Sequence, residues 1–186
     1  MTSSMPPGLR KFALALHLAI SVGWIGAVAA YLALDVVAAA SEDAQMLRAA
    51  YIAMKPIASY VIVPLALASL LTGLVMSLGT NWGLFRHYWV LISLVLTVVA
   101  TAVLLIETEV ISSLAVMAAD PTTSDEALRA MPSTLVHSVG GMVVLLVMLV
   151  LNVYKPQGMT RYGWRRQREL RARPVRSMNP FAEFSS

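Results

Sequence analysis

Three histidines are the side chains of this sequence best suited to chemistry, because a neutral imidazole can bind a metal ion or carry a proton. They are His17, His87 and His137, and each lies in or beside a long apolar run. Two imidazoles that face each other at one depth could hold the iron of haem b, whereas a single buried imidazole could handle protons. All three are therefore candidate cofactor-binding residues, and a hydrogen bond between helices is the structural alternative for each.

The first apolar run, between Lys11 and Asp35, carries a line of polar residues. At about 100° per residue in a helix, these residues fall on one face. This polar stripe consists of His17, Ser21, Trp24, Tyr31 and Asp35. A polar face on so apolar a segment must meet protein, water or a bound group, and an ionisable residue there is a functional candidate.

Asp35 ends the polar stripe, and we expect it to be a water-exposed carboxylate at the end of its helix. The alternative is an outer cation-attracting site that it would share with Glu107 or Glu109. The opposite face of the same run carries small residues, which predict close packing against another helix. Those small residues are Ala19, Gly23, Gly26, Ala27 and Ala30.

The composition places this chain in a membrane. Of its 186 residues, 58% are hydrophobic and 13% are charged, against about 25% charged residues in soluble domains. It contains no cysteine, which excludes disulfides, thiolate metal sites, iron–sulfur clusters and covalently attached c-type haem. We therefore expect a multi-pass protein of the cell membrane with one small embedded domain.

Four apolar runs are long enough to cross a bilayer, which needs about 20 apolar residues in a helix. They cover about 12–34, 57–79, 88–106 and 133–154 within an embedded domain of about 12–154. Residues 1–11 form a polar lead, and residues 155–186 form a basic tail. The predicted fold is all-α, a bundle of four transmembrane helices that run up, down, up and down.

The segments that join these runs carry their own signals. A short surface helix is expected over about 42–54, after which Pro56 can begin the second spanning helix. Pro64 lies inside that helix and should kink it, because proline removes one backbone hydrogen bond. Residues 107–132 are read as an acidic link between the third and fourth helices.

Small and hydroxyl residues recur at four-residue spacing in the two middle runs. Ser69, Gly73 and Ser77 predict a close approach of the second helix to a neighbour. Ser93, Thr97 and Thr101 line one face of the third helix and are suited to hydrogen bonds between helices.

Charge predicts the orientation. Residues 35–55 carry two basic and three acidic residues, and 107–132 carry one basic and five acidic. The lead carries two basic residues and no acidic one, and the tail eight basic and two acidic. The positive-inside rule therefore places both termini in the cytoplasm, with His17 and His87 on that side and His137 on the outer side. The tail is expected to contact anionic lipid rather than nucleic acid.

The first helix also carries a resemblance. Leu16-His17-Leu18 followed by Gly23-Trp24-Ile25-Gly26 resembles predicted four-helix integral membrane proteins of unknown function and, more distantly, copper-resistance D-type membrane domains. The resemblance implies a four-helix fold and haem or copper handling, with His17, His87 and His137 as ligands. Ala27 stands where the copper-type pattern commonly has a second glycine, and the outer loops are not methionine-rich. Both departures count against copper transport.

Three functions remain open from the sequence. The leading hypothesis is a small membrane protein that binds haem b or a metal through its histidines for electron transfer. The second is a small permease or proton-linked carrier, with the polar stripe lining its path. The third is a structural or accessory subunit, which would bind a membrane partner or a second copy of itself. No phosphate-binding glycine loop, Gly-x-Ser-x-Gly elbow or His-Glu-x-x-His motif is present, so no residue is assigned a catalytic role.

Overall fold

The computed structural model describes residues 5–79, 85–156 and 158–172. Its regular elements in these ranges are helices, apart from one isolated bridge between His87 and Met159. In chain order they are α1 (Pro7–Ala40), α2 (Ala44–Pro56), the π-helix η1 (Ile57–Ile62), α3 (Val63–Gly79), α4 (Tyr88–Ala119), α5 (Asp125–Arg129), α6 (Leu135–Tyr154) and α7 (Arg161–Ala172). The predicted all-helical architecture is confirmed.

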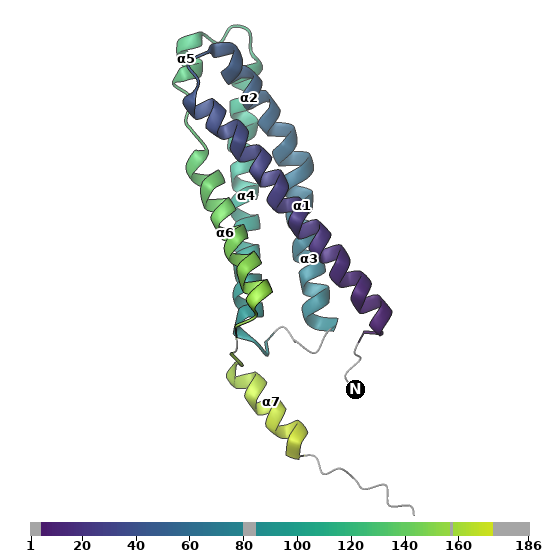
Figure 1. The fold of residues 1–186 in the computed structure, drawn as a ribbon. Coiled ribbons are helices and arrows are strands. Elements are labelled where there is room, and N and C mark those ends of the chain that lie inside the picture. The colour runs from purple at the N-terminus through teal and green to yellow at the C-terminus, as the bar shows by residue number, and fades with distance from the viewer. Residues whose placement is uncertain (1–4, 80–84, 157, 173–186) are drawn as a thin grey trace, which may run out of the picture.

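Four helical segments of the described chain are long and apolar enough to cross a membrane: α1, the continuous run α2–η1–α3, α4 and α6. They run alternately up and down, so that α1 begins and α6 ends at the same end of the bundle (Figure 1). We call this the inner end. Helix α5 lies at the opposite end, which we call the outer end (Figure 1).

Helix α4 runs on to Ala119, well past the end predicted near residue 106. Glu107 and Glu109 are therefore helical residues, and the prediction that they belong to a link was wrong. Glutamate is a good helix former and the following residues are again apolar, so nothing ends the helix there. It ends where Asp120 takes an extended conformation (φ −74°, ψ 117°) before Pro121, as expected for a residue that precedes proline.

The second of these apolar segments is one continuous helix from Ala44 to Gly79, so the new start predicted at Pro56 was wrong. Its π-helical turns lie directly before Pro64, and the Val63 N–H bonds to the Ala58 carbonyl, five residues back. Proline has no N–H to give to the carbonyl four residues earlier, and its ring crowds that carbonyl. The wider turn accommodates Pro64 without ending the helix.

The outer end holds the two largest fully buried apolar side chains of the described chain. Side chains of α2, α4 and α5 meet there, and both Met54 and Leu128 are 1% exposed. Their buried neighbours are Leu47, Ala50, Tyr51, Ile111, Leu114 and Ala118.

Arg48 of α2 closes this end by binding the last carbonyls of α4. Its guanidinium donates to the carbonyls of Ala118 (2.9 Å) and Asp120 (2.8 Å), and also to that of Thr123. Because the last four carbonyls of a helix have no partner within the helix, a cation there satisfies them and complements the helix dipole.

Helix α7 is fixed to the start of α4 at the inner end. The Thr160 N–H donates to the Arg86 carbonyl (3.0 Å), and its hydroxyl accepts the Gly163 N–H (3.1 Å) as a helix cap. A Cβ on Gly163 would lie 2.5 Å from the Arg86 oxygen, so this close approach requires glycine. The predicted basic tail begins with this ordered helix, and its residues 173–186 lie outside the described part.

Candidate functional site

His17 lies on the face of α1 that packs against α3. Its Nδ1 is 2.8 Å from the hydroxyl oxygen of Thr72. Gly73 leaves room for the ring, since a Cβ there would come within 3.4 Å of His17 Cε1. The small residues of α3 were predicted to allow a close approach, and at Gly73 this approach makes room for the His17 imidazole. Ser69 forms a hydrogen bond with Ser21 of α1 across the same interface (3.3 Å).

Thr72 favours one tautomer of His17. Its hydroxyl lies 2.7 Å from the Ala68 carbonyl of its own helix and can donate its single hydrogen there. The Thr72 oxygen then accepts from Nδ1–H of His17, and in this tautomer Nε2 carries a lone pair. Within the described chain Nε2 has no hydrogen-bond partner, so it is available to a ligand.

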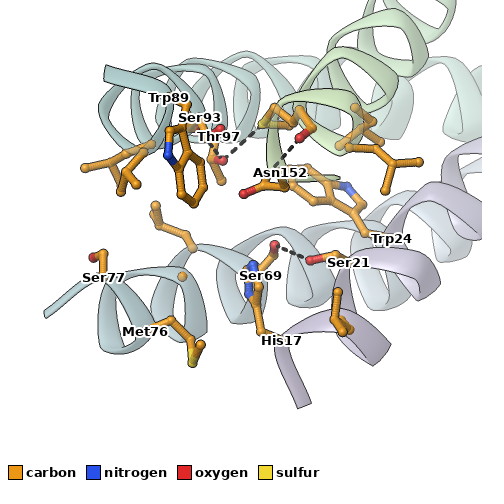
Figure 2. Close-up of a pocket in the computed structure, with 18 of the residues that line it drawn as sticks. His17, Ser21, Trp24, Ser69, Met76, Ser77, Trp89, Ser93, Thr97 and Asn152 are labelled. Carbon is orange, nitrogen blue, oxygen red and sulfur yellow. Dashed lines mark hydrogen bonds between the residues drawn. The ribbon is translucent and has the colours of Figure 1, made fainter. Parts of the chain in front are cut away.

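His17 lines an inner cavity of about 360 Å³ between α1, α3, α4 and α6. His17 and Ser69 lie on one side of it, and Trp89, Ser93 and Thr97 lie on the other (Figure 2). The polar stripe contributes three residues to the wall, His17, Ser21 and Trp24. The volume is within the range of small-molecule sites, about 300–1,000 Å³.

Two buried polar atoms at this cavity lack partners in the described chain. They are Nε1 of Trp24, whose side chain is 4% exposed, and Oγ of Ser93, which is 9% exposed. Buried polar groups nearly always have a hydrogen-bond partner, which is either protein or water. Both atoms are closed off from solvent, so binding at either one would need a neighbouring side chain to move.

The outer part of the stripe is buried among hydroxyl groups. Asp35 is 1% exposed. Its carboxylate accepts from Thr134 at 3.0 Å and from Ser138 at 2.6 Å, and the Tyr31 hydroxyl lies 3.2 Å from that of Thr134. The prediction of a water-exposed Asp35 was wrong, because α1 continues to Ala40 and α6 begins beside the carboxylate.

His137 belongs to a second cavity, of about 280 Å³, on the outer side of Trp24. Its Nε2 is 3.5 Å from Oε1 of Glu107, and the two side chains are 56% and 18% exposed. Trp24 and Leu145 line both cavities and so lie between them.

His87 immediately precedes α4 and lines neither cavity. Each cavity thus contains one histidine at most, and the described chain holds no group of three or more histidine, aspartate and glutamate side chains placed to bind a metal ion. A pair of facing histidines is not part of this arrangement.

Sequence reasoning missed the partners of the stripe: Thr72, Thr134 and Ser138. Thr134 and Ser138 stand four residues apart at the start of the fourth run, which is a signal for a shared polar face. Comparisons of the chain with protein-family models, curated proteins and solved structures find no match.

Proposed function

We propose that this chain is an integral protein of the cell membrane, with both termini in the cytoplasm, that binds a cofactor through His17 in its inner cavity. Four apolar helices and the excess of basic residues at the inner end support the membrane topology. The observation that carries the function is the hydrogen-bond chain from Ala68 through Thr72 to His17, which leaves Nε2 free to bind.

The chemistry of this arrangement fits a metal-containing cofactor. A histidine that binds a metal usually donates its other ring N–H to a hydrogen-bond acceptor, and that bond fixes the ring and its tautomer. Thr72 supplies this acceptor. Haem b, or a single metal ion, would take one protein ligand here, and the cofactor would supply redox chemistry in the inner half of the bundle.

The test is an absorption spectrum and metal analysis of protein purified with haem and metals supplied. Wild type should carry a stoichiometric cofactor, and His17→Ala should abolish binding. Thr72→Val keeps the side-chain shape but removes the acceptor, and should weaken binding by about 10–100-fold. His87→Ala and His137→Ala are the matched controls and should leave binding unchanged. A protein without haem or metal, or an unchanged spectrum in His17→Ala, would contradict the proposal.

The orientation can be tested separately, because a chain without cysteine allows single cysteines to report on access. Glu126 and Arg161 are exposed at opposite ends of the bundle. A membrane-impermeant thiol reagent should label Glu126→Cys in intact cells, and should label Arg161→Cys only after lysis. The reverse pattern would overturn the topology.

A small permease is the second candidate, favoured by the position of Trp24 and Leu145 between the two cavities. A path from one cavity to the other would have to open past these side chains. Solute uptake into liposomes that is lost in His17→Ala, from protein without a cofactor, would select this function over the first.

A further inference from the structure

We propose that Asp35 is a proton-binding site that communicates with the outer cavity and is separate from the His17 site. Asp35 is a carboxylate at 1% exposure inside an apolar helix bundle. Such a charge is costly unless it is paired or can be neutralised. In the described chain no lysine, arginine or histidine forms an ion pair with it.

The charged and titratable groups of this region come from α1, α2, α4 and α6. Tyr31 on α1 and Tyr51 on α2 interact with Asp35, Glu107 on α4 interacts with Tyr31, and His137 on α6 stands beside Glu107. Of the basic residues on α2 and α5, Arg48 donates to three carbonyls and Arg129 to the Glu42 carbonyl (2.9 Å), and Lys55 forms no ion pair with Asp35 in the described chain. A proton is therefore the cation best placed to compensate Asp35.

The hydroxyl groups can satisfy both protonation states. When Asp35 is ionised, Thr134 donates to Oδ1, Ser138 donates to Oδ2, and Tyr31 donates to Thr134. When Oδ2 takes up a proton, that new O–H can donate to Ser138 at the same 2.6 Å separation. Ser138 then turns its own hydrogen to the Leu135 carbonyl, 3.1 Å away. One proton is bound, and no backbone atom has to move.

Two opposing effects act on the carboxylate. Burial disfavours its charge, whereas the first turn of α6 favours it, because Thr134 is the cap residue of that helix and helix N-termini attract anions.

The outer cavity gives the proton a way in. Tyr31, Thr134 and Ser138 line this cavity together with Glu107 and His137. The His137 side chain is 56% exposed and stands 3.5 Å from Glu107. The His137 imidazole is open to solvent, and the Glu107 side chain, which is 18% exposed, is the more buried of the two.

The experiment is a pH titration of the full chain in liposomes, followed by infrared spectroscopy of the carboxyl C=O stretch. Acidification should produce one band from a protonated carboxyl that is shielded from water. Labelling aspartate with carbon-13 in its side-chain carboxyl should shift this band without altering the protein. Asp35→Asn should remove the band and should take up one proton fewer over the same pH range.

Ser138→Ala should change the frequency of the band, because the hydroxyl that serves both states is gone. Ser113→Ala is the matched control: Ser113 is exposed, its hydroxyl bonds within its own helix, and the band should be unchanged. If wild type shows no shielded carboxyl band at any pH at which it stays folded, Asp35 is a permanently ionised structural group and the proposal fails. It also fails if the band does not shift with labelled aspartate.

Discussion

The two ends of the bundle differ in how their helices pack: the outer end has a closed core, and the inner end has a cavity. At the outer end α2, α4 and α5 interlock, Met54 and Leu128 are buried to 1% exposure, and Arg48 closes the end of α4. At the inner end the same bundle contains an open cavity of about 360 Å³, and buried polar atoms of Trp24 and Ser93 have no hydrogen-bond partner in the described chain. The comparison leads us to expect that the outer end contributes most to the stability of the fold, whereas the inner end has the room that the proposed cofactor requires.

Matched methionine truncations test this division most strongly. Met54→Ala removes a side chain from the closed outer core, and should lower the free energy of unfolding by about 2–5 kcal/mol. Met76→Ala enlarges an inner cavity that already exists, so it should cost clearly less. Thermal unfolding of both variants in one detergent measures the difference. Equal losses would mean that the two ends are packed alike.

The second-largest loss of unfolding free energy is expected from substitution of Arg48. Arg48→Met keeps the apolar stem but leaves three carbonyls at the end of α4 without their donor, at a cost of about 2 kcal/mol. Arg48→Lys retains the charge and should recover part of that loss. The measurement is unfolding free energy, with cofactor binding as the second readout. A variant that lost binding while keeping its stability would connect the outer end to the inner site.

Glycine-to-alanine changes compare the two cavities at a smaller scale. Around Gly140, which lines the outer cavity, no atom lies within 4 Å of an added Cβ. Gly140→Ala should therefore stabilise the helix by about 0.5–1 kcal/mol. Gly73→Ala places its Cβ 3.4 Å from the His17 ring, and should weaken binding at His17. Destabilisation by Gly140→Ala would show that this face packs against another molecule.

The smallest effect is expected at Asp120, in the exposed turn after α4. Hydrogen bonds from the hydroxyl and the backbone N–H of Thr122 lower the pKa of Asp120 below its ordinary value of 3.8. A lowered pKa stabilises the fold above that ordinary value, and this contribution disappears as pH falls through the lowered one. Wild type should therefore lose its small advantage over Asp120→Asn on acidification below about pH 4. A thermal-midpoint difference that does not vary with pH would contradict this.

The sequence was sufficient to predict the helical bundle, because long apolar runs have few alternatives. It also indicated which residues of α1 share a face, since helical periodicity is local. What the faces meet could not be read from one helix. The small-residue face was predicted to pack, yet Ala19, Gly26 and Ala30 are exposed, whereas Trp24 and Tyr31 of the polar face are buried.

Hydroxyl residues show why partners are hard to predict. Thr97 and Thr101 were expected to bond between helices. Thr97 does so, since its hydroxyl lies 3.1 Å from the sulfur of Met148 on α6, but both hydroxyls also lie 2.7 Å from a carbonyl four residues back, which is the acceptor of Thr101. A carbonyl four residues back is always within reach of a hydroxyl in a helix. The hydroxyl therefore bonds to it unless a neighbouring helix offers a stronger acceptor. Asp35 offers a better one to Thr134 and Ser138, and this depends on where α6 begins.

The π-helix η1 determines in which direction the side chains of α3 point relative to those of α2. Tyr51 and Met54, before it, face the outer core, whereas Thr72, after it, faces His17. Deleting one residue from Ile57–Ile62 would restore ordinary helical geometry, and would turn everything beyond it by about 100° and shorten it by about 1.5 Å. The helix could then satisfy the outer core or His17, but not both. A single extra residue in this turn thus allows a rigid end and a binding end to share one helix.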